Sequence, residues 1–328
     1  MQLADHFGIL LRDTVNLSQG RLDLLASRVS SIYAAIEADS AYGTYVNGKS
    51  PQGSWAHRTI INPVGDKEYD ADFMLRMDDV DDWTPREYLT KLNSALGAHT
   101  TYGPMPRERK NRCVRVVYAN SCHIDVVPSI SRGGLEYIAN YDTDDWERTD
   151  TQGFSDWMKA KDGAARGDLR RVIRLMKFLR DHKKSFTGTR SVILTTLLGE
   201  QVSETRAAID PSYYSNVPTS LLHIVSDLDD WLQARPSRPS IADPSGSGIT
   251  FDHRWSDESY LYFRDRIHVH AANIREAYDC DDYDESLELW QGIFGSGFVA
   301  PADNKSSGKF GTAPAAAGVS SSLSGRAG

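Results

Sequence analysis

The stretch that decides the fold is GSWAHRTIINPVGDKEYDADFML, residues 53–75. It opens on two small residues, Gly53 and Ser54, and it ends in a strand-like run that carries Asp70 and Asp72. Side chains alternate between the two faces of a strand, so these two carboxylates point the same way, roughly 7 Å apart. Like charges this close raise the pKa of one partner unless a cation lies between them. The stretch therefore poses the question of what faces the two acids.

A third acid, Asp125, lies within an apolar strand-like run, HIDVVP, where a lone charge is costly. A divalent metal that carries nucleotide phosphates would relieve the repulsion among three such carboxylates, and a pair of Mg²⁺ ions about 4 Å apart is usual for phosphoryl-type displacement. Gly53 and Ser54 let backbone amides approach phosphate oxygens. The alternative is an acid pair on a solvent-facing strand. The acids of residues 78–82 are interpreted as a solvated loop.

Composition excludes several classes of function. The chain has 328 residues and a net charge of −8, which argues against constitutive nucleic-acid binding, because binding to the phosphate backbone needs a dominant basic face. Its three cysteines have no metal-site spacing. No apolar run approaches the roughly 20 residues that span a bilayer, and the first residues lack a signal-peptide pattern. We expect a reduced, cytoplasmic protein that is not held in a membrane.

Hydrophobic periodicity divides the chain. Three- and four-residue spacing predicts helices over 18–38, 84–96 and 168–184, with Ser18 and Asp168 as candidate N-caps. Residues 69–77 and the runs 112–119 and 122–130 read as strands, the last two as a hairpin joined at residues 120–121. Residues 42–54 read as a turn-rich passage. We expect an α+β protein: an α/β core with a long N-terminal helix (1–155), a helical lobe (156–300) and a flexible tail rich in small residues (301–328).

The order G-S-W, then D-A-D in a strand, then a distant strand Asp resembles the nucleotidyltransferase superfamily with the DNA polymerase β-like fold. Within it, most of the chain resembles the bacterial CD-NTases, relatives of cyclic GMP–AMP synthase and oligoadenylate synthase. The resemblance implies two lobes, a mixed sheet with helices and an oligoadenylate-synthase-like helical lobe, with the active site in the cleft between them. It implies phosphate contact by Gly53 and Ser54, and ligation of two Mg²⁺ ions, or of Mn²⁺, by the catalytic acids Asp70, Asp72 and Asp125.

Two further segments carry the resemblance. RLMKFLRDHKKSF (174–186) is similar to the family helix whose lysine reaches the donor triphosphate, followed by a phosphate-contacting serine, which maps these roles to Lys177 and Ser185. LELWQGIFGSGF (287–298) is similar to the closing W-x-x-x-F-G element, in which we expect Trp290 and Phe294 to be core anchors.

Two features near the acids are open to interpretation. The basic stretch 106–116 is either a surface hairpin edge or an anion site. We place His123 on the strand face opposite Asp125 and interpret it as a packing or hydrogen-bonded histidine, not a base.

The resemblance implies an enzyme that joins nucleoside triphosphates, ATP and GTP or others, into a cyclic di- or trinucleotide with release of pyrophosphate. The product would be a second messenger of CBASS-type anti-phage defence and would switch on a separate effector protein. Two alternatives are a nucleotidyltransferase with another acceptor (a small molecule, an RNA end or a protein) and a catalytically silent nucleotide-binding protein. The tail ends in Gly328, which suits conjugation or a regulatory partner; an ordinary disordered end is the alternative.

Overall fold

Strand β2 (Tyr69–Met77) organises the first half of the chain, in a computed structural model that describes residues 1–119, 122–252 and 255–301. It lies in a sheet of order β1-β2-β5-β4-β3, to which β6 and β7 are added beside β5. The other strands are β1 (Val46–Gln52), β3 (Arg107–Arg109), β4 (Val114–Tyr118), β5 (Cys122–Arg132), β6 (Leu135–Asn140) and β7 (Asp145–Thr149). β2 and β5 are parallel and every other pair is antiparallel, so the sheet is mixed.

Helices precede the sheet, interrupt it and then replace it. They are α1 (Ala4–Leu10), α2 (Gln19–Glu37), α3 (Gly53–Ala56), α4 (Pro85–Ala98), α5 (Thr151–Ala164), α6 (Leu169–His182), α7 (Ser191–Glu200), α8 (Glu204–Ile209), α9 (Val217–Gln233), α10 (Asp257–Asp279) and α11 (Tyr283–Phe294), with the short turns η1 (Leu11–Val15) and η2 (Gly43–Tyr45). The predicted α+β class, with a mixed sheet and a helical second half, is confirmed. The predicted helices and the strand 69–77 also form, and the two strands of the predicted hairpin pair antiparallel, each within a few residues of its predicted ends. The joining residues 120–121 lie outside the described ranges.

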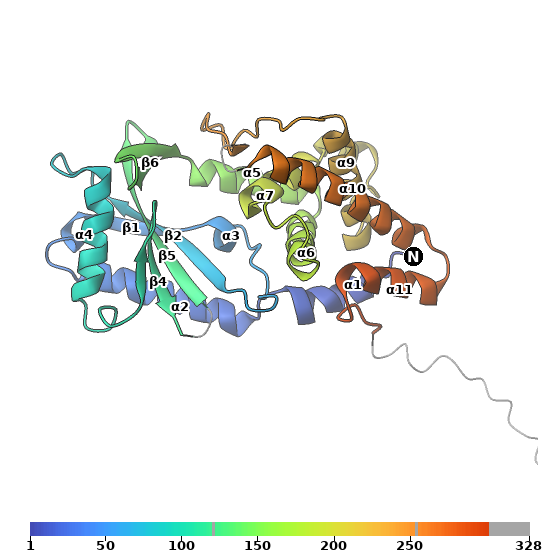
Figure 1. The fold of residues 1–328 in the computed structure, drawn as a ribbon, viewed down its shortest axis with the longest axis horizontal. Coiled ribbons are helices and arrows are strands. Elements are labelled where there is room, and N and C mark those ends of the chain that lie inside the picture. The colour runs from blue at the N-terminus through green and yellow to red at the C-terminus, as the bar shows by residue number, and fades with distance from the viewer. Residues whose placement is uncertain (120–121, 253–254, 302–328) are drawn as a thin grey trace, which may run out of the picture.

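The two faces of β2 have different surroundings. Its residues Ala71, Phe73 and Leu75 are fully buried and pack with the apolar faces of α2 and α4 in the core of the sheet lobe. Because side chains alternate along a strand, Asp70 and Asp72 lie on the opposite face. In Figure 1 that lobe stands beside the helical one, and α3 lies between the strands and α6. The sheet core therefore fixes which face of β2 presents the two acids.

The prediction for residues 42–54 was wrong, because most of this passage is strand β1. It pairs antiparallel with β2, from Val46 opposite Met77 to Gln52 opposite Asp72. Its glycine and proline residues indicated turns in the sequence. Strand β1 is an edge strand, however, where proline is tolerated because one side of the strand makes no ladder hydrogen bonds. Strand β1 delivers the chain directly into the Gly-Ser turn.

The helical lobe has its own core, and the first residues of the chain belong to it. Phe7 of α1 contacts Trp290 edge-on, with ring centroids 4.9 Å apart. Trp290 and Phe294 are buried, which confirms them as core anchors. The boundaries at residues 155 and 300 stay predictions, but α1 packs away from the sheet lobe in which the sequence placed it. The conjugation idea for Gly328 falls on residues outside those described.

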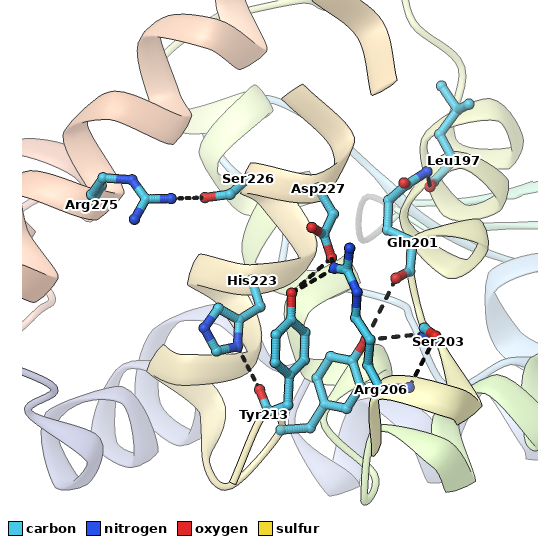
Figure 2. A network of polar contacts seen from close by, with 10 residues as sticks. Leu197, Gln201, Ser203, Arg206, Tyr213, His223, Ser226, Asp227 and Arg275 are labelled. Atoms are coloured by element: carbon cyan, nitrogen blue, oxygen red, sulfur yellow. Dashed lines mark hydrogen bonds and ion pairs between the residues drawn. The ribbon is translucent and has the colours of Figure 1, made fainter. Parts of the chain in front are cut away.

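A closed polar network braces the corner between α8 and α9 (Figure 2). Arg206 contacts Asp227 and, at 2.7 Å, the hydroxyl of Tyr213, which itself donates to Asp227 at 3.1 Å. Burial, together with the nearby Asp227 carboxylate, raises the pKa of Tyr213 to about 12. His223 stacks on Tyr213, with ring centroids 3.9 Å apart. These groups satisfy one another, so the network is structural.

No helix in the described ranges combines the length and the apolar character needed to cross a membrane.

Candidate active site

A cavity of about 760 Å³ opens where the sheet lobe meets the helical lobe. Its walls come from β2, β5, α3 and α6, and from the segments that join them. Six of the seven site residues predicted from the sequence line it: Gly53, Ser54, Asp70, Asp72, Asp125 and Lys177. The structure thus brings together residues that lie more than 120 positions apart in the sequence.

The three acids are neighbours on two parallel strands. The register of β2 and β5 sets Asp72 beside Asp125 and Asp70 beside His123. Burial, and then the charges of Asp70 and Asp125, hold the pKa of Asp72 well above its ordinary value. A positive charge placed among these carboxylates would relieve both effects.

Arg115 of β4 holds the third acid. Its Nε and Nη2 atoms donate to the two carboxylate oxygens of Asp125, each at 2.8 Å, which is the bidentate geometry that arginine forms with carboxylates. Asp125 is almost fully buried, and its only described ion pair is this one. Part of the stretch 106–116 lines the cavity through Lys110, Arg112 and Arg115. Its residues 107–109 form β3, an edge strand of the sheet, so the interpretation as a surface hairpin edge also holds, and an anion site there stays a prediction.

We expect Arg115→Met to lower the free energy of unfolding by about 1–3 kcal/mol, since it leaves a buried carboxylate unpaired. In the double variant with Asp125→Asn, much of that loss should disappear because no charge remains to be paired. Urea unfolding of the four proteins of this cycle measures the coupling. Strictly additive losses would contradict a stabilising contact between the two side chains.

The prediction of the face for His123 was wrong. Residues two apart in a strand share a face, so His123 points to the same side as Asp125. Its Nε2 lies 3.7 Å from Asp70 Oδ2, and its Nδ1 lies 2.9 Å from Glu68 Oε2. The interpretation as a hydrogen-bonded histidine is confirmed, with Glu68 as the partner, and His123 borders the acid cluster.

The Gly-Ser pair forms the start of α3, and only glycine fits its first position. Gly53 has φ +61°, and a Cβ atom there would lie 2.6 Å from Asp72 Oδ2. The backbone at Gly53 therefore runs directly against a predicted metal ligand. The turn and β2 are built as one unit, in which the phosphate-binding segment predicted from the sequence touches the acid pair.

Lys177 lies across the cavity from the sheet. Its ammonium donates to the carbonyl oxygen of Thr59 at 3.1 Å and contacts Thr59 Oγ1 at 3.2 Å. Burial and the charge of Arg180 lower the pKa of Lys177 to about 8. Only 5% of the residue is exposed. Lys177 is thus a desolvated cation whose described contacts are neutral oxygens.

Ser185 lies elsewhere. It is buried in the helical lobe, does not line the cavity, and its hydroxyl is 3.1 Å from His270 Nε2 of α10. Burial lowers the pKa of His270 to about 4, so its ring is neutral at pH 7. The structure therefore groups Ser185 with the core of the second lobe.

The carboxylate oxygens of the site are ligands that suit a divalent cation. Among the described residues, however, no three His, Cys, Asp or Glu side chains are already arranged around a common metal position. Asp70 and Asp72 offer carboxylate oxygens from one strand face, the ligand type that Mg²⁺ prefers. Burial, and then the charges of Asp70 and Asp125, raise the pKa of Asp72, and a bound cation would offset those negative charges. Asp125 can join them while it keeps both hydrogen bonds from Arg115, because each of its oxygens has a second lone pair.

Sequence reasoning missed several residues of the cavity wall, above all Arg115, Thr59 and His57. Burial and the neighbouring charges of Lys177 and Arg170 lower the pKa of His57 to about 4, so its ring is neutral. For Arg115 a signal existed, because it is the second residue of the apolar strand β4 and belongs to the basic stretch 106–116. Thr59 and His57 become visible only when α6 is packed against them.

The chain is similar to several nucleotide second-messenger synthases. Residues 1–162 match the family described as the Second Messenger Oligonucleotide or Dinucleotide Synthetase domain. The chain is 24% identical to a c-di-GMP synthase of Roseivirga ehrenbergii, over 75% of this chain and 72% of that protein. It is 22% identical to a cyclic AMP-AMP-AMP synthase of an Acinetobacter species, over 80% of this chain and 74% of that protein.

The fold agrees along nearly the whole chain with a solved structure. Vibrio cholerae DncV cyclic AMP-GMP synthase in complex with nonhydrolyzable GTP has a TM-score of 0.72 to this chain at 15% identity, over 91% of this chain and 97% of that one. The family model covers residues 1–162, whereas the sequence relatives and the fold match extend over most of the chain. Residues 1–162 thus resemble second-messenger nucleotide synthetases in sequence, and nearly the whole chain has the fold of the solved bacterial CD-NTases.

Proposed function

We propose that this enzyme joins nucleoside triphosphates into a cyclic di- or trinucleotide and releases pyrophosphate at each step. The observation that carries the proposal is that Asp70 and Asp72 share one face of β2, beside Asp125, in a cavity that Lys177 also lines. The sequence relatives support it, because one is named for a cyclic dinucleotide and the other for a cyclic trinucleotide.

In this mechanism the acids hold two Mg²⁺ ions, for which Mn²⁺ could substitute. The bound ions lower the pKa of the attacking ribose hydroxyl and stabilise charge on the leaving pyrophosphate. Asp70 and Asp72 would hold the metal, and the amides at Gly53 and Ser54 and the ammonium of Lys177 would contact the phosphates of the donor triphosphate.

Asp125 takes the proton of the acceptor hydroxyl. Each of its oxygens accepts one hydrogen bond from Arg115 and keeps a second lone pair, so Arg115 can hold the carboxylate in place while the proton is accepted. A second attack inside the same cavity closes the ring. Ser185 has no part in this mechanism, because it does not line the cavity.

We expect nucleotide binding to take up a proton at Lys177. Its pKa of about 8 means that at about pH 8.5 most of the free protein carries a neutral amine there. The negative phosphates favour the charged form and raise that pKa, so the amine takes a proton from the buffer. Calorimetry of nonhydrolysable nucleotide binding in two buffers of different ionisation enthalpy measures this uptake. The Lys177→Arg variant is the control, since arginine stays protonated; equal uptake by both proteins would remove Lys177 from the phosphate site.

We infer that the cyclic product acts as a second messenger. The resemblance to CD-NTases supports CBASS-type anti-phage signalling, in which the nucleotide switches on a separate effector protein.

The test incubates the protein with each radiolabelled nucleoside triphosphate, singly and in pairs, with Mg²⁺ or Mn²⁺, and then with phosphatase. A phosphatase-resistant product that the Asp70→Asn/Asp72→Asn protein does not make supports the proposal, and its mass gives the ring size. A product that forms only when a small molecule, an RNA or a protein is supplied would replace the cyclic product with a different acceptor. Nucleotide binding without turnover under every condition would overturn catalysis.

A further inference from the structure

Three cations on one face of α6 hold three consecutive backbone carbonyls of residues 57–59. The cations are four and three positions apart, the spacing that aligns side chains along a helix face. The hydrogen bonds run from Arg170 Nε to His57 O (2.9 Å), from Arg174 Nη1 to Arg58 O (2.9 Å) and from Lys177 Nζ to Thr59 O (3.1 Å). We call this arrangement the α6 ladder.

The ladder holds the segment that follows the Gly-Ser turn. The amide of His57 donates to the carbonyl of Gly53 at 3.2 Å, and the amide of Thr59 donates to that of Ser54 at 2.9 Å. Residues 57–59 are therefore bonded through their amides to the turn and through their carbonyls to α6. Any displacement of this segment relative to α6 carries the turn with it.

The backbone conformation of Arg58 has to be held in place by contacts from outside the segment 57–59. Arg58 is not glycine, yet its φ is +56°, in the left-handed region that costs a residue with a side chain roughly 1–2 kcal/mol. Such a conformation persists only where its surroundings hold it. The described hydrogen bond to the Arg58 carbonyl comes from Arg174. Without it, the segment is free to relax to an ordinary backbone conformation.

Stabilising the fold is not enough to explain the α6 ladder, because its clustered cations cost folding free energy. Arg174 is half-buried, its Nε atom finds no hydrogen-bond partner among the described residues, and burial beside Arg171 and Arg170 lowers its pKa. Buried cations that repel one another cost free energy. Arg170 is compensated, since Asp162 of α5 accepts from its side chain and, at 3.0 Å, from its backbone amide. Arg174 has no described ion pair.

We propose that Arg170 and Arg174 are positioning residues for nucleotidyl transfer, which fix the Gly-Ser turn to the helix that carries Lys177. The donor triphosphate can then bind at the same time to the backbone amides of the Gly-Ser turn, from the sheet lobe, and to the Lys177 ammonium, from the helical lobe. This inference rests on the proposed function. It predicts that breaking the ladder weakens triphosphate binding more than it weakens the fold.

The experiment compares Arg174→Met with Arg171→Met. Arg171 is an arginine of the same helix, but it pairs with Asp168 one turn away and has no described contact with residues 57–59. Binding of nonhydrolysable ATP and GTP with Mg²⁺ is measured by calorimetry, at a temperature well below the melting point of every variant. We expect Arg174→Met to weaken binding about tenfold, or about 1.4 kcal/mol, and Arg171→Met by less than twofold.

Two further readouts separate positioning from a general loss of structure. Arg174→Lys, which keeps a donor for the Arg58 carbonyl, should recover most of the affinity. Hydrogen–deuterium exchange over residues 53–60 should be faster in Arg174→Met than in Arg171→Met, with the rest of α6 unchanged. Equal affinities for the two methionine variants, or a lysine variant as weak as Arg174→Met, would overturn the inference and leave the proposed function standing. A parent protein that neither binds nor converts nucleotides would instead overturn the proposed function.

Discussion

Asp72→Asn protein is expected to lose nucleotide-joining activity by at least about 10³-fold while melting at a higher temperature than the parent. The loss follows because the side chain is proposed to hold Mg²⁺ and the donor triphosphate, and an amide is a much weaker metal ligand than a carboxylate. The higher melting temperature is expected in the protein without metal, where the ionised Asp72 carboxylate is partly buried beside Asp70 and Asp125.

The sign of the stability change follows from proton linkage. The folded pKa of Asp72 is raised, so the folded protein binds this proton more tightly than the unfolded chain does. Stability is then present below the ordinary carboxyl pKa and is lost as the pH rises toward the folded value. Asparagine is neutral at every pH. The advantage of the variant should therefore be small in acid and grow toward neutral pH.

Thermal melts in EDTA from about pH 4 to pH 8 measure this trend, beside the product assay in Mg²⁺. Asp82→Asn is the matched control, because Asp82 is an exposed acid of the loop after β2. It should change neither readout. If Asp72→Asn kept a tenth of the parent activity, Asp72 could not be a metal ligand. If the variant melted at a lower temperature than the parent at neutral pH, repulsion among the three carboxylates could not be what destabilises the parent protein.

Gly53→Ala is expected to reduce turnover about 100-fold while the protein still folds. The new Cβ atom would lie 2.6 Å from Asp72 Oδ2, about 0.8 Å short of the 3.4 Å at which ordinary contact begins. The easiest relief is rotation of the Asp72 carboxylate, which costs the fold little but displaces a predicted metal ligand. The left-handed backbone adds a stability cost of roughly 1–2 kcal/mol.

Gly65→Ala separates these two effects. Gly65 has φ +64°, close to the +61° of Gly53, but a Cβ there meets nothing within 4 Å. The two variants should lose similar free energies of unfolding in urea, and only Gly53→Ala should lose turnover and Mn²⁺ affinity. Equal activities would show that the contact between the turn and Asp72 has no role in catalysis.

Local patterns were enough to find the elements that carry the acids. The alternation in YDADFMLRM marks a strand with Asp70 and Asp72 on one face, and the spacing of apolar residues along α2 and α6 marks helices with one buried side. These features depend on neighbours within a few residues, so the sequence determines them. Strand β1 escaped detection because an edge strand tolerates the glycine and proline that usually indicate a turn.

What faces the acids was decided by contacts between distant residues. Arg115 reaches Asp125 only because β4 and β5 pair in one particular register, and Lys177 reaches Thr59 across 118 positions. Likewise, α1 packs in the helical lobe because Trp290 lies there, and Ser185 lies away from the cavity because α10 covers it. The sequence by itself determined the acid-bearing strands β2 and β5 and the amphipathic helices α2, α4 and α6. Only the tertiary structure decided which of them meet, because such contacts depend on the packing of whole elements and leave no local period in the chain.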